Sequence, residues 1–234
     1  MGSEMCIRDS HKRLPRAARV FAWQLLHGGL LSGGSLVHML QHAQLPTALC
    51  PCIACAALSP RPLATLHHVF MQCPVGSSAL RWLCQLWGRI EQGAGPAFVP
   101  SLLLADSWHA WQPRQHLQGL WVLLRVTMLR RIWLAYSAAR DGEASAFTPA
   151  AVRGAFVAEV RDLIQQDWLR VGGDLRQLSG VCPAWLRGRD STMALPQFTA
   201  AWCVGGVLAR VEPAPAGAAA GRPQLRMCLS VDSA

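Results

Sequence analysis

Lysine is almost absent from this sequence, since Lys12 is the only one among 22 basic residues. Acidic residues are also few, 13 of 234, and no two aspartates are adjacent. A polymerase palm needs a carboxylate pair to hold its metal ions, and nucleotide-binding folds need a glycine-rich P-loop or GxGxxG turn. The sequence contains none of these motifs. We therefore expect the chain to have no catalytic site of its own.

Charge is missing altogether between Val20 and Pro60. A membrane-spanning helix needs about 20 predominantly apolar residues. Polar residues and glycines interrupt the run at every turn, among them Gln24, His27 and His38. These groups would face lipid without hydrogen-bond partners, so the pattern argues against a membrane segment.

The composition indicates a folded, basic protein. Hydrophobic residues make up 52% of the chain, charged residues 15%, and the net charge is +9. A basic excess favours a polyanionic partner such as RNA or DNA, although an incidentally basic protein would look the same. The arginines that could follow a phosphate backbone, or simply form solvated helix faces, are Arg13, Arg16, Arg19, Arg125, Arg130 and Arg131.

Nine cysteines are present, and four of them lie within 24 positions. Their number is odd and no signal peptide precedes them. This usage favours a reducing compartment and metal ligation over a disulfide framework. We expect an intracellular location, in the nucleus or the cytoplasm.

We expect the first ten residues to be a sequencing artefact. Back-translated with a GTG start, residues 1–10 fit the end of a sequencing adapter, and such a segment has no part in the fold. The native chain would then begin near His11 as the tail of something longer. We expect a compact module at 11–92, a helical extension at 93–211 and a linker or disordered tail at 212–234.

Hydrophobic periodicity predicts a mostly α fold. Helices are expected over 16–26, from Ser77 or Ser78 to about 90, over 117–140, and from Thr148-Pro149 to about 168. The stretch 193–210 fits a helix or a strand equally well. The segment 45–62 contains four prolines and is predicted to be a loop.

That loop contains the first residues of the only set of candidate metal ligands that the sequence suggests. Cys52, Cys55, His68 and Cys73 have the spacing C-x2-C-x12-H-x4-C. Thiolates and imidazole are ligands that zinc prefers, and four protein ligands leave no open position, so the site would be structural. Cys50 can replace Cys52 and His67 can replace His68, and a chance cluster of cysteines is the remaining alternative.

The flanking residues resemble the reverse-transcriptase zinc-binding family. The resemblance rests on Arg19-Val20-Phe21-Ala22-Trp23-Gln24-Leu25-Leu26-His27-Gly28, then the CxxC, then His68-Val69-Phe70-Met71-Gln72-Cys73-Pro74 and Leu80-Arg81-Trp82-Leu83. It covers about residues 13–92. Ala64 departs from the family's usual Glu, and Gly29 and Leu31 depart from its usual Arg and Pro.

The resemblance implies a function. It makes Cys52, Cys55, His68 and Cys73 the ligands of a structural Zn²⁺ and the chain a nucleic-acid-binding accessory region of a non-LTR retrotransposon reverse transcriptase. The polymerase domain would be encoded upstream in the same polyprotein, and RNA or DNA binding would be weak and nonspecific. The alternatives are a helical protein-interaction scaffold with a zinc staple and a decayed, inactive retroelement fragment.

Overall fold

A computed structural model describes residues 14–33, 35, 48–93, 95–103, 113–172, 193–213 and 223–232. The longer elements, in chain order, are α2 (Arg16–Leu26), α4 (Ile53–Ala56), α5 (Pro74–Glu91), α6 (Gln118–Arg140), α7 (Pro149–Gly172), α8 (Leu195–Trp202), β1 (Ala209–Glu212) and β2 (Gln224–Met227). A π-helical turn, η3 (His68–Gln72), precedes α5, and short 3-10 turns are η4 (Pro100–Leu103), η6 (Gln115–Leu117), η7 (Ala144–Ala146) and η9 (Val204–Gly206). The predicted mostly α fold is confirmed.

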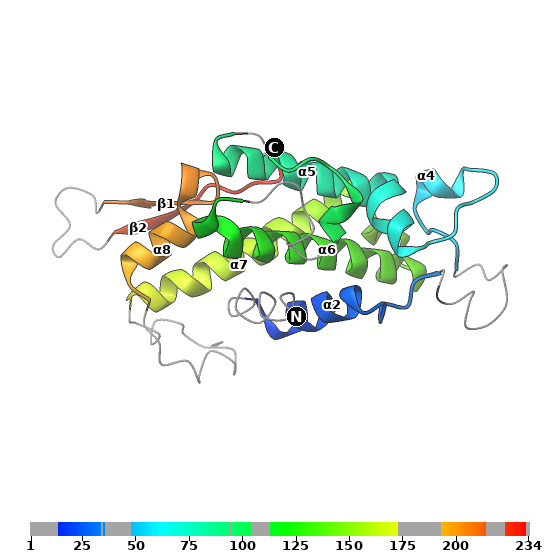
Figure 1. The fold of residues 1–234 in the computed structure, drawn as a ribbon, viewed down its shortest axis with the longest axis horizontal. Coiled ribbons are helices and arrows are strands. Elements are labelled where there is room, and N and C mark those ends of the chain that lie inside the picture. The colour runs from blue at the N-terminus through cyan, green and yellow to red at the C-terminus, as the bar shows by residue number, and fades with distance from the viewer. Residues whose placement is uncertain are drawn as a thin grey trace.

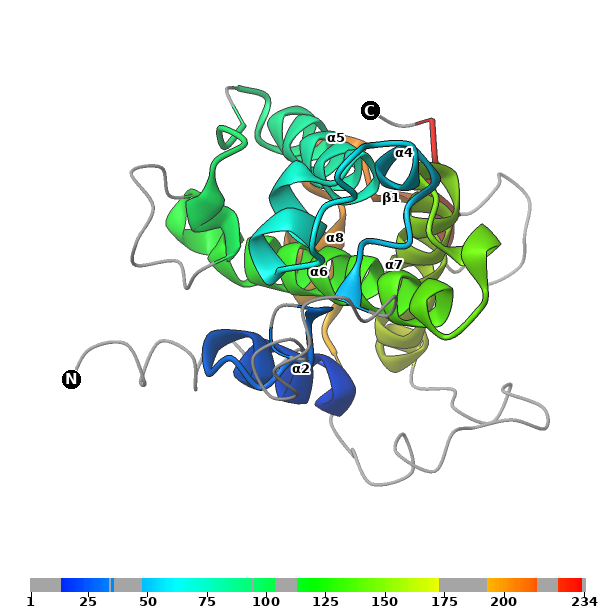
Figure 2. The ribbon, with the colours of Figure 1, turned by 90° about the vertical axis from the view of Figure 1, so that its right-hand side faces the viewer.

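Helix α6 forms the centre of the molecule. Every residue from Leu120 to Leu129 is buried, so the helix is covered on all sides over this stretch. Helices α2, α5 and α7 and the turn η3 all contact it. Figures 1 and 2 show α5 and α2 on opposite sides of α6.

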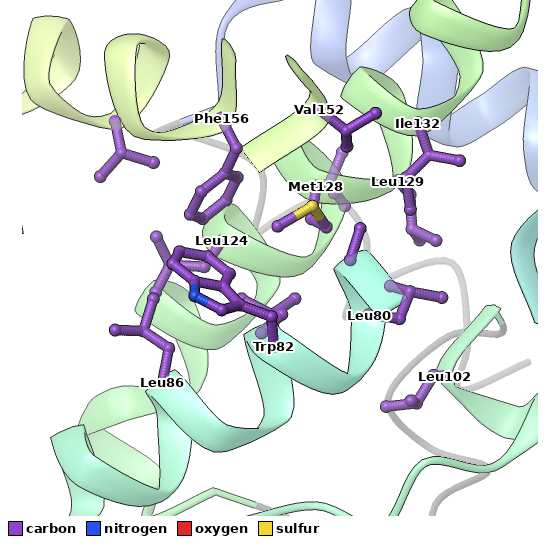
Figure 3. Packing of buried hydrophobic residues seen from close by; sticks show 14 of the residues in the cluster. Leu80, Trp82, Leu86, Leu102, Leu124, Met128, Leu129, Ile132, Val152 and Phe156 are labelled. Carbon is purple, nitrogen blue, oxygen red and sulfur yellow. The ribbon is translucent and has the colours of Figure 1, made fainter. Parts of the chain in front are cut away.

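The core between α5, α6 and α7 consists of interlocking large side chains (Figure 3). Trp82 of α5 meets Phe156 of α7 edge to face, with ring centroids 5.6 Å apart. Leu124 and Met128 of α6 are fully buried beside them. Such a pair of aromatic rings contributes about 0.5–1.5 kcal/mol beyond its buried area. These three helices therefore hold the scaffold on which the Cys/His cluster is built.

Two predicted helices have the expected bounds, and one begins earlier than expected. Helices 16–26 and 117–140 match α2 and α6, and Thr148 Oγ1 accepts a hydrogen bond from the Ala151 amide at the start of α7. Neither Ser77 nor Ser78 caps α5. The helix begins at Pro74, with Cys73 at the N-cap position, because proline is favoured in a first turn.

The C-terminal region differs from the predicted linker or disordered tail. Strand β2 pairs antiparallel with β1 in the register Ala209↔Met227 to Glu212↔Gln224. Leu229 is then fully buried, and its carbonyl accepts a hydrogen bond from Arg161. The alternation of polar and apolar residues in these four-residue strands is too short to stand out in the sequence. Residues 214–222 lie outside the described residues, as do the predicted artefact at 1–10 and Arg13.

Within the described part of the chain, no helix combines the length and the apolar character needed to cross a membrane.

Candidate metal centre

Four buried side chains converge beside the N-terminus of α5. The ligand atoms of Cys50, Cys55, His68 and Cys73 all lie within 4.8 Å of one another. The Cys73 Sγ is 3.8 Å from the Cys50 Sγ and 4.0 Å from the Cys55 Sγ. The His68 Nε2 is 3.5 Å from the Cys55 Sγ. This group can bind one metal ion through three sulfurs and one nitrogen.

A closed loop presents the first two cysteines. Leu49 and Leu63 form an antiparallel bridge at its base, and the Cys50 amide donates to the Pro62 carbonyl at 3.0 Å. The Arg61 guanidinium donates twice to the Cys50 carbonyl, at 2.6 and 2.8 Å. These bonds fix the backbone of Cys50 from both directions.

The turn η3 and the start of α5 present the other two ligands. The Cys73 amide donates to the His68 carbonyl at 2.6 Å, which closes the π-helical turn. The Thr65 hydroxyl accepts a hydrogen bond from the His68 amide. Gly76 lets α5 approach this turn, because a Cβ there would lie 2.0 Å from the Val69 carbonyl oxygen. A side chain at this position would separate the two ligands.

The structure places Cys50, and not the predicted Cys52, in the group. Cys52 is buried but occupies the N-cap position of α4, where its carbonyl accepts the Ala56 amide at 2.8 Å. Its own amide forms a hydrogen bond to the Cys50 thiol. The two grouped cysteines of this loop are therefore spaced C-x4-C instead of C-x2-C, and the second of them, Cys55, lies within α4.

The other predicted ligands lie as expected. Cys55, His68 and Cys73 belong to the group, and the alternative His67 is exposed to solvent. Cys84, Cys203 and Cys228 lie outside it.

The three thiols of the group have unequal pKa values. The hydrogen bond to Cys73, followed by burial, raises the pKa of Cys50. Burial and the negative charge of Cys73 raise the pKa of Cys55 to about 12. The hydrogen bond from Cys50 lowers the pKa of Cys73 to about 4 despite burial, helped by His68 and by backbone amides at the start of α5. Near neutral pH the group therefore holds one thiolate and two thiols before a metal binds.

This distribution predicts a steep pH dependence of metal binding. Above pH 7 the Cys50 and Cys55 thiols are still protonated, whereas Cys73 has already lost its proton. Each bound metal must displace two protons, so affinity should rise about 100-fold per pH unit between about pH 7.5 and 8.5. Competition with a chromophoric chelator, corrected for the chelator's own protonation, measures this slope. An affinity that does not change with pH would contradict the assignment.

The choice between Cys50 and Cys52 has its own test. We expect Cys50→Ser to lower metal affinity at least about 100-fold, because it removes a candidate ligand thiolate. Cys52→Ser should keep one metal per chain, since the Cys52 thiol is not among the four ligand atoms that converge. Each variant replaces one sulfur atom of the wild type by oxygen, so the two are matched controls for each other. The reverse ranking of their affinities would return Cys52 to the ligand set.

The predicted nucleic-acid arginines fall into different environments. Arg16 and Arg19 are exposed on α2. Arg130 and Arg131 both form ion pairs with Glu159 of α7. Arg125 is only 6% exposed and donates to the Leu102 carbonyl. It lies inside the protein and cannot follow a phosphate backbone, because α6 is buried at this level.

Sequence reasoning missed other arginines. Arg81, Arg89 and Arg210 are exposed, and each lines a surface hollow. Arg81 and Arg89 are eight residues apart within α5. This spacing is visible in the sequence, but only the structure shows that both side chains lie on the exposed side of the helix.

Searches against protein-family models, curated proteins and solved structures found no match for this chain.

Proposed function

We propose that this chain is a structural-zinc, nucleic-acid-binding accessory region of a retrotransposon reverse transcriptase. The observation that supports it is the buried group of Cys50, Cys55, His68 and Cys73. The family resemblance of residues 13–92 supplies the biological context. In this proposal the polymerase chemistry belongs to a domain encoded upstream.

Zinc fits the dimensions of the group. A tetrahedral ion with Zn–S of about 2.3 Å and Zn–N of about 2.0 Å separates its sulfurs by about 3.8 Å and a sulfur from a nitrogen by about 3.5 Å. The corresponding distances here are 3.8 and 4.0 Å between sulfurs and 3.5 Å between sulfur and nitrogen. Soft thiolates with one imidazole also favour zinc over magnesium or calcium.

The role of this zinc would be structural. Three sulfurs and one nitrogen complete a tetrahedron and leave no position for water or substrate. All four side chains are buried, so a substrate has no path to the ion. The ion would tie the loop 48–64 to the N-terminus of α5.

Nucleic-acid binding is the functional part of the proposal and is supported by the net charge of +9. We expect weak, sequence-tolerant binding whose log-affinity falls by about 0.7–0.9 per phosphate contact against log salt. Fluorescence anisotropy of labelled RNA and DNA at low salt measures it. Saturable, salt-sensitive binding supports the proposal, and no binding at micromolar protein would refute it.

A protein-interaction scaffold is the second candidate, and one surface favours it. Val20, Trp23 and Leu26 of α2 are 49%, 62% and 37% exposed. Apolar residues at this helical spacing form a stripe of the kind that partner proteins cover. Absence of nucleic-acid binding, together with self-association that Trp23→Ser abolishes, would favour this candidate.

A further inference from the structure

The exposed side of α5 carries positive charge without negative charge. Its outward positions include Arg81, Gln85 and Arg89, which follow one another at intervals of four residues and lie on one face. The only acid of the helix, Glu91, is turned inward. It is buried and accepts hydrogen bonds from the Trp87 indole and the Arg114 amide.

Two hollows lie along this face, one beside each arginine. The first, of about 500 Å³, is lined by Arg81, Gln85 and Arg153 of α7, among others. The second, of about 390 Å³, is lined by Arg89 together with Arg210 and Arg226 of the β1–β2 hairpin. Eight residues of α-helix separate Arg81 from Arg89, a rise of about 12 Å.

The second hollow brings like charges together. Arg210 and Arg226 are direct partners in the β1–β2 register, and like charges directly opposite each other destabilise a strand pair. The Arg210 guanidinium also fills the space next to Gly206, where a Cβ would lie 2.6 Å from its Nε. The φ of 65° at this position favours glycine. An anion in the hollow would relieve the repulsion.

Few acids oppose these arginines among the described residues nearby. Glu212 pairs with Arg226 at 3.1 Å, in a solvent-exposed bridge that contributes little. Asp232 follows Val231, whose carbonyl accepts the Trp82 indole N–H. Five arginines line the two hollows, and neither lining contains a carboxylate.

We propose that this face of α5, with its two hollows, binds the phosphodiester backbone of a nucleic acid. Arginine suits phosphate oxygens because its planar guanidinium donates two parallel hydrogen bonds. A linear polyanion suits two arginines that lie about 12 Å apart along α5, since one strand of B-form DNA places a phosphate about every 3.4 Å along the axis of the duplex. This inference rests on the proposed function and assigns its binding surface to α5 in place of α2 and α6.

The test compares two variants of equal charge in the full chain. R81Q/R89Q removes two arginines from the α5 face, and R16Q/R19Q removes two from α2, on the opposite side of α6 (Figure 1). The probe is fluorescein-labelled single-stranded RNA of mixed sequence, titrated at several salt concentrations. We expect R81Q/R89Q to weaken binding on the order of tenfold at low salt and to reduce the salt slope by about 1.4, with R16Q/R19Q close to the wild type.

A second variant covers the chance that Arg81, which stacks over Phe98, is needed for folding. R210Q/R226Q changes only the hairpin side of the second hollow and should also lower affinity and slope. Circular dichroism of each variant confirms that it is folded.

The contrary outcomes are distinct. Wild-type protein that does not bind RNA at low salt refutes both the proposed function and this inference. Wild-type binding that R81Q/R89Q and R16Q/R19Q weaken equally refutes only the α5 surface. Displacement of RNA by polyglutamate as effective, per charge, as by unlabelled RNA would assign the face to an acidic protein and overturn the inference.

Discussion

The Cys55→Ser variant should lose the structure of residues 48–65 while the helical core stays folded. This segment has little apolar surface of its own to bury, since Ile53 and Leu58 are 73% and 58% exposed. A structural zinc supplies on the order of 10 kcal/mol to a small module of this kind. Hydrogen exchange measured by mass spectrometry should show rapid exchange across 48–65 and protection in α6 and α7.

We expect the loss of structure to end at the turn η3. Val69 and Phe70 are fully buried against the core, so packing holds them without the metal. A chelator applied to the wild type should reproduce the pattern of Cys55→Ser, and Cys84→Ser, outside the group, is the matched control. Retained protection across 48–65 in Cys55→Ser would show that the loop orders itself without the metal.

Phe156→Ala should cause a large loss of stability in the helical core. Phe156 is fully buried, and its ring packs on Trp82 between α5 and α7 (Figure 3). Removing a buried phenylalanine costs about 3–5 kcal/mol, from lost transfer free energy and from the cavity that remains. Urea unfolding followed by tryptophan fluorescence measures the change in the free energy of unfolding.

The matched control is Leu134→Ala on α6. Leu134 is 41% exposed, so its truncation should change stability by no more than about 0.5 kcal/mol. Similar losses for the two variants would mean that the α5–α6–α7 contacts do not form the core described.

Sequence patterns predicted the long helices because their signals are local. The apolar spacing of α2 and α6 and the Thr148-Pro149 start of α7 need no tertiary information. The start of α5 was missed because two signals compete there. Ser77 and Ser78 are good caps, but Cys73-Pro74 begins the helix four residues earlier, where a proline in the first turn is favoured.

The sequence predicted a Cys/His group, and the structure brings Cys50 in place of Cys52 into it. Cys55 and Cys73 follow from their spacing, whereas Cys50 remained an alternative to Cys52 and His67 an alternative to His68. Whether Cys50 or Cys52 enters the group depends on where α4 begins and on the bridge between Leu49 and Leu63, and neither can be read from local sequence. The α5 face was missed for the same reason: Arg81 and Arg89 join Arg210 and Arg226 only in three dimensions.

X-ray absorption at the zinc edge, combined with elemental analysis of the purified protein, tests the metal centre most directly. We predict one zinc per chain, with three sulfurs at about 2.3 Å and one nitrogen at about 2.0 Å. The Cys52→Ser protein should give the same spectrum, because Cys52 lies outside the group. Protein without stoichiometric zinc, or a four-sulfur shell with Cys52 as a ligand, would contradict the centre formed by Cys50, Cys55, His68 and Cys73.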